Sequence, residues 1–83
     1  MSVEAMLACQ AAFLQANESF ERAREAADRA ARQLVVATRG VWRPCRELDS
    51  AAGEYLRARQ LMNASEVVVL DAAEAWVQAA TRV

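Results

Sequence analysis

The sequence of 83 residues contains no histidine and no lysine, and it has only one proline, two glycines and two cysteines. Without histidine it lacks the commonest general base and metal ligand, and a four-ligand zinc site would need carboxylates. We therefore expect no enzyme: no catalytic residues, no metal, no cofactor and no small-molecule substrate. The scarcity of glycine and proline excludes a turn-rich all-β domain, and a hydrophobic content of 55% excludes a disordered chain.

The cysteines and charges point to a cytoplasmic protein. Cys9 and Cys45 are too few for a disulfide-stapled secreted scaffold, and their spacing matches no metal or redox motif. The stretch from Met1 to Phe20 has no basic start and no unbroken apolar run, which argues against a signal peptide, a membrane span or a membrane partner. Ten arginines are balanced by eleven acidic residues, so the net charge of -1 gives no general attraction for nucleic acid.

Alanine is abundant, and the composition predicts an all-α protein with one helical domain over residues 1–83. Gly40 is a natural helix stop, and Pro44 suits the first position of a following helix. We expect a helix over about residues 3–39, a turn at 40–43 and a helix over about 44–82, folded into a long antiparallel hairpin. As an alternative, the second helix breaks near Asn63, because Asn63 and Glu66 have the form of a capping box.

Apolar residues recur at alternating steps of three and four in both halves of the chain, which predicts a coiled-coil seam on each helix. The first seam is Met6, Cys9, Phe13, Ala16, Phe20, Ala23, Ala27, Ala30, Leu34, Ala37 and Val41. The second is Leu48, Ala51, Tyr55, Ala58, Met62, Ser65, Val69, Ala72, Trp76, Ala79 and Val83. Ser65 is the one clearly polar member, and we expect its hydroxyl to bond to the carbonyl one turn back.

Pairing the seams supports the hairpin. If residues meet when their numbers sum to 85, large side chains face small ones in nearly every layer, as in Cys9 with Trp76 and Phe13 with Ala72. Only the layer of Ala27 and Ala58 is small on both sides. In this arrangement Cys9 and Cys45 lie near opposite ends and cannot form a disulfide within one chain. Gly53, which costs about 1 kcal/mol relative to alanine inside a helix, suggests that a neighbour approaches closely there.

Several large apolar residues lie off the seams: Leu7, Leu14, Val35, Val36, Leu56, Leu61, Val67, Val68, Leu70 and Val77. Leaving them in water would sacrifice much of the stability of so small a chain, so we expect another surface to cover them. Two hairpins joined into a four-helix bundle would do so, and so would a different protein. We expect the interface at the open end of the hairpin, formed by Leu7, Leu14, Val68, Leu70 and Val77.

The predicted turn gathers Arg39, Trp42, Arg43 and Arg46 at the tip of the hairpin. Arginine and tryptophan are enriched at binding hot spots and in base stacking, so this tip could contact an acidic protein surface or, less readily, nucleic acid. In the simplest interpretation Trp42 instead folds back onto Val35 or Val36 and closes the bundle end.

Two resemblances bear on function. Tyr55, Asp71 and Gln78 resemble the tyrosine, later aspartate and near-terminal glutamine of the last helix of type III secretion needle subunits, which are short helical hairpins. That family has lysines on its last helix, and this chain has none. A hairpin with a tryptophan at its turn is also similar to the small WXG secreted proteins, although here Gly40 precedes Trp42. The resemblance to needle subunits implies a structural subunit of a secretion-system or phage-type assembly.

The main functional hypothesis is a small non-enzymatic helical module for protein–protein interaction, such as an adaptor, chaperone or inhibitor. It would act through an apolar face that binds a second copy or another protein. The first alternative is the assembly subunit, and the second is weak nucleic-acid binding through the turn.

Overall fold

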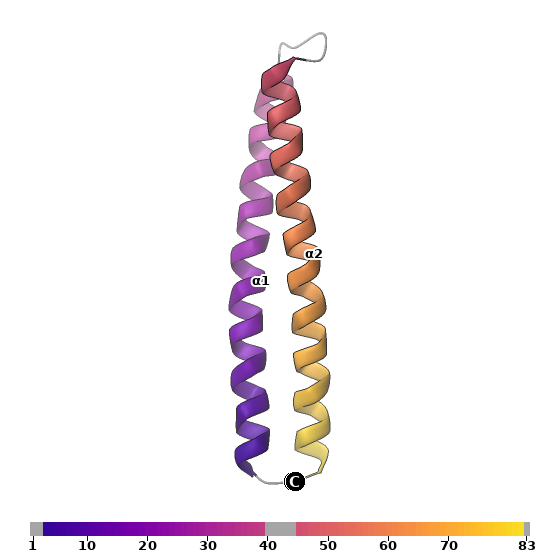
Figure 1. The fold of residues 1–83 in the computed structure, drawn as a ribbon. Coiled ribbons are helices and arrows are strands. Elements are labelled where there is room, and N and C mark those ends of the chain that lie inside the picture. Colours follow the sequence, from indigo (N-terminus) through magenta and orange to yellow (C-terminus); the bar gives the residue numbers. More distant parts are fainter. Residues whose placement is uncertain (1–2, 40–44, 83) are drawn as a thin grey trace.

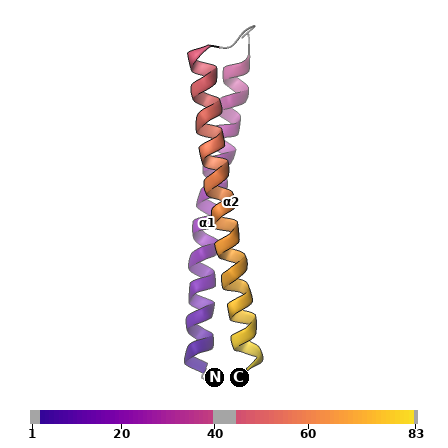
Figure 2. The same cartoon turned by 45° about the vertical axis from the view of Figure 1, so that its right-hand side comes forward.

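The computed structural model describes residues 3–39 and 45–82, and in this part of the chain it contains two α-helices (Figure 1). Helix α1 spans Val3–Thr38 and helix α2 spans Arg46–Thr81, each with 36 residues. The helices run antiparallel and pack along their length, so the start of α1 and the end of α2 lie side by side (Figure 2). The predicted all-α antiparallel hairpin is confirmed.

The limits of the helices differ slightly from the prediction. The first helix ends at Thr38, one residue early, and the second begins at Arg46 rather than at 44. Cys45 is the N-cap residue, because its backbone is extended (φ -145°, ψ 168°) while its carbonyl accepts the hydrogen bond of the Asp49 N–H at 3.0 Å. The predicted turn at 40–43 and Pro44 lie outside the described residues.

The alternative with a break near Asn63 is wrong, because α2 continues through this residue. The seam residues on either side, Met62 and Ser65, remain half-buried, so the packing against α1 is continuous. The Ser65 Oγ donates a hydrogen bond to the Leu61 carbonyl oxygen at 2.9 Å, as predicted. The one polar residue of the seam is therefore satisfied within its own helix.

The two helices meet along the predicted seams. Every seam residue from Met6 to Ala37 and from Leu48 to Ala79 is buried or half-buried. The most deeply buried residues are alanines, namely Ala23, Ala27, Ala30 and Ala79, with exposed fractions of 2–9%. The larger seam side chains stay half-covered, and the rings of Phe13 and Trp76 pack at 5.4 Å between centroids with an interplanar angle of 35°. The core is thus a row of small residues edged by partly exposed aromatics.

The hairpin forms a thin rod of 61 × 13 × 13 Å with a radius of gyration of 18.5 Å, against about 12 Å for a compact chain of this length. Its accessible surface is 6196 Å², whereas a compact protein of 9.1 kDa exposes about 4900 Å². A layer of two helices covers only one stripe of each, so roughly 1300 Å² more surface faces solvent than in a compact fold. Within the described residues, neither helix has a stretch long and apolar enough to cross a membrane.

Candidate interaction surfaces

The large apolar residues off the seams are exposed. All ten that the sequence singled out have exposed fractions between 51% and 61%. The structure adds Val3, which is 53% exposed and which sequence reasoning missed although it lies off the seam. A soluble chain usually scatters such residues singly, so eleven of them among the described residues of one thin rod make an unusually apolar surface.

The heptad positions divide these residues between two sides of the rod. In each heptad we label the first seam residue a, as in Met6 and Trp76. The seam residue three positions later is d, as in Cys9 and Ala79. At 100° per residue, positions b and e then lie on one side of the seam and positions c and g on the other. Three surface hollows that both helices line confirm this division, because apart from seam residues each is lined by b and e residues or by c and g residues, and none by both sets.

The first side carries the open-end patch, defined as Leu7, Leu14, Leu70 and Val77, all at position b. The pairs Leu7 with Val77 and Leu14 with Leu70 each sum to 84, so the members of each pair lie at nearly the same height on the two helices. Beside them, Val77 lines a hollow together with Met6, Gln10, Trp76 and Ala80. This hollow joins e residues of both helices and has half-buried aromatic surface at its floor.

The second side carries the central groove, which consists of two hollows that share Ser19 and Ser65. The first hollow is lined by Ala12, Gln15, Ala16, Ser19, Ser65 and Val68, and the second by Ser19, Arg22, Ala23, Ala26, Leu61 and Ser65. Alanines, Ser19, Gln15 and Arg22 of α1 form one wall, and Leu61 and Val68 of α2 form the other. The Arg22 Nη2 donates a hydrogen bond to the Ser19 Oγ at 3.3 Å on the rim.

The predicted five-residue interface is therefore not one surface. Val68 lines the central groove, whereas Val77 lines the hollow at the open end. Leu7, Leu14 and Leu70 share the heptad position of Val77 and lie on its side. The prediction grouped these residues by their height along the rod and did not take their heptad positions into account.

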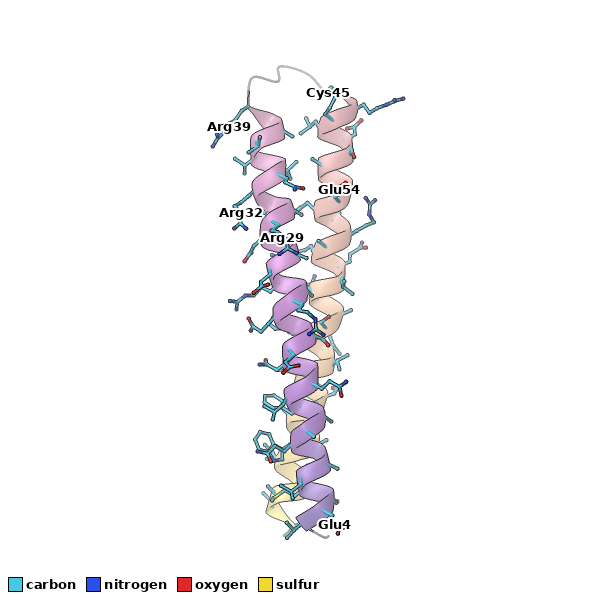
Figure 3. All side chains as sticks on the ribbon, turned by 90° about the vertical axis from the view of Figure 1, so that its left-hand side faces the viewer. Glu4, Arg29, Arg32, Arg39, Cys45 and Glu54 are labelled. Atoms are coloured by element: carbon cyan, nitrogen blue, oxygen red, sulfur yellow. The ribbon has the colours of Figure 1, made fainter. Side chains whose placement is uncertain are left out.

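At the turn end, the described members of the predicted tip, Arg39 and Arg46, are exposed, and Trp42 and Arg43 lie outside the described residues. Arg39 and Arg32 extend from α1 away from α2 (Figure 3). They flank Val35 and Val36 around a shallow hollow on α1. The arrangement places two guanidinium groups beside exposed apolar surface, which suits contact with an acidic and apolar protein surface.

The described residues contain no group of three or more histidine, cysteine, aspartate or glutamate side chains that could hold a metal ion. Cys9 and Cys45 are both free and half-buried. Cys45 lies at the turn end (Figure 3), whereas Cys9 lies six residues into α1 from the open end. The rod therefore separates the two thiols, as the hairpin predicted.

No protein family matches the sequence, and neither the curated proteins nor the solved structures gave a match. The resemblances to needle subunits and WXG proteins therefore do not amount to family membership.

Proposed function

We propose that the protein is a non-enzymatic helical module that works by binding protein through its exposed apolar surface. The observation that carries this proposal is the exposure, between 51% and 61%, of all ten large apolar residues off the seams. Full burial of a valine or leucine side chain contributes about 1.5–3 kcal/mol. Covering the four half-exposed residues of the open-end patch would therefore contribute several kcal/mol, on the order of what a weak protein complex needs.

The arrangement of the patch also suits a protein partner. Its four side chains come from both helices, and one of them, Val77, lines a hollow that Trp76 also lines. Two helices with apolar ridges and a shallow valley between them accept a further amphipathic helix in the usual geometry of helix packing. The two free thiols suit a reducing compartment, so we take the cytoplasm as the site of action.

The experiment compares Leu70→Glu with Asn63→Glu. Both residues are exposed, occupy position b of α2 and are one heptad apart, but only Leu70 belongs to the open-end patch. We expect Leu70→Glu to weaken association at least tenfold, because a carboxylate would be buried against apolar side chains, and Asn63→Glu to leave it unchanged. Binding through the patch is read as the proteins that an immobilised chain retains from an extract of the source cells, and the mass of the pure chain shows separately whether copies associate.

The outcome that overturns the proposal is a chain that stays monomeric at every concentration and that retains the same proteins in both variants. Circular dichroism of the two variants serves as the folding control.

The rod shape supports the alternative of a structural assembly subunit, because a rod of 61 × 13 Å with apolar sides can also stack without limit. Growth of the mass with concentration without a plateau would favour that function. Binding of nucleic acid through the turn has support only from the exposure of Arg39 and Arg46.

A further inference from the structure

We propose that a second copy of this chain closes the central groove, giving a four-helix bundle whose two-fold axis runs along the rod. This inference rests on the proposed function. It identifies the protein that is bound as a second copy and the binding surface as the central groove.

Charge decides which side of the rod a second copy covers. On the side of the open-end patch, the e positions at mid-rod are Arg24, Arg59 and Glu66, all exposed, and these would point into the middle of a bundle formed there. On the groove side, the corresponding g positions over the same length are Ser19 and Ala26 on α1 and Leu61 and Val68 on α2. The g positions of this stretch are therefore uncharged, and the one charged residue that lines the groove, Arg22, is exposed and bonded to Ser19.

The two walls of the groove complement each other in size. A two-fold axis along the rod sets α1 of one copy beside α2 of the other, at the same height and antiparallel. Ser19 then faces Val68 of the second copy, and Ala26 faces its Leu61. The residue numbers of both pairs sum to 87, whereas residues at the same height sum to 85. The two members of each pair therefore differ in height by two residues, or about 3 Å of helix rise. Each large residue of α2 therefore meets a small residue of α1, and the symmetry repeats both contacts.

The polar seam residue that lines the groove, Ser65, already has a hydrogen-bond partner. The Ser65 hydroxyl already donates to the Leu61 carbonyl oxygen, so its burial would leave no donor without a partner. The rod as a whole exposes roughly 1300 Å² more than a compact fold, and a standard interface buries about 800 Å² from each partner, so the surplus is large enough for one such interface. A second copy brings the matching wall with it, whereas an unrelated helix would have to supply one.

The test compares Val68→Glu with Val67→Glu by sedimentation equilibrium. These neighbouring valines are 56% and 57% exposed, so they differ in direction and not in burial within the hairpin. Val68 lines the groove, and Val67 lies 100° further round α2, on its outer face. We expect Val68→Glu to weaken the dimer about 100-fold or more, because it buries an unpaired carboxylate, and Val67→Glu to change it less than about threefold.

A charge-swap pair separates loss of the contact from loss of folding. Ser19→Arg should also weaken the dimer, but a mixture of Ser19→Arg chains with Val68→Glu chains should recover it as a heterodimer, because the new arginine faces the new glutamate.

Two outcomes overturn the inference. One is a wild-type chain that is monomeric throughout, and the other is a dimer that Val68→Glu leaves intact or that mixing fails to restore. Both leave the proposed function standing if Leu70→Glu still abolishes the retention of a partner, so the failures of the two proposals are distinguishable.

Discussion

At the scale of single residues, heptad position decides burial more than size does. Ala79 is 2% exposed, while Leu70, a much larger apolar residue on the same helix, is 59% exposed. Trp76 lies on the seam and packs its ring against Phe13, yet it too keeps some exposure because two helices cannot enclose an indole. The stability of the isolated hairpin should therefore depend on seam residues and hardly at all on the apolar residues of the outer surface.

The comparison of Trp76→Ala with Val67→Ala tests this dependence. Trp76→Ala removes a half-buried aromatic contact, and we expect it to lower the free energy of unfolding by about 2–3 kcal/mol. Val67→Ala, on the outer face, should change it by no more than about 0.5 kcal/mol. Urea denaturation followed by circular dichroism measures both, and equal losses in the two variants would contradict the seam packing.

At the scale of the helices, the sequence predicted the two helices and their pairing. It could do so because apolar residues recur at alternating steps of three and four through both halves of the chain. It predicted less well where local signals compete with packing. Asn63 and Glu66 have the form of a capping box, but Met62 and Ser65 hold their places in the seam and α2 continues through them. Pro44 favours a helix start, but Cys45 is extended and the helix begins after it.

Gly53 was expected to allow the close approach of a neighbour, and the hairpin shows no such approach. A Cβ at this position would meet only the Arg57 guanidinium of its own helix, at 3.4 Å from Nη1, which is an ordinary contact. We therefore expect Gly53→Ala to stabilise the protein by about 1 kcal/mol and to raise its melting temperature by roughly 4–8 °C. Thermal denaturation measures this, with Ala52→Gly as the matched change of opposite sign. A loss of stability in Gly53→Ala would mean that a neighbour does pack against the glycine.

At the scale of the whole molecule, the surplus of apolar surface follows from the shape. The sequence predicted the residues that remain uncovered, since each lies off a seam, and it placed their interface at the open end. It grouped Val68 with Leu7, Leu14, Leu70 and Val77 by their height along the rod, whereas heptad position, g for Val68 and b for the other four, sets the side on which each residue lies. The central groove was not predicted, because it forms only where lining residues of α1, such as Ser19 and Ala26, lie beside Leu61 and Val68 of α2.

Association of two copies through the central groove is tested most directly by the absolute mass of the chain in solution. Light scattering after size exclusion, over a wide range of concentrations, should give a plateau at twice the chain mass of 9.1 kDa. A mass of 9.1 kDa at every concentration would contradict the claim.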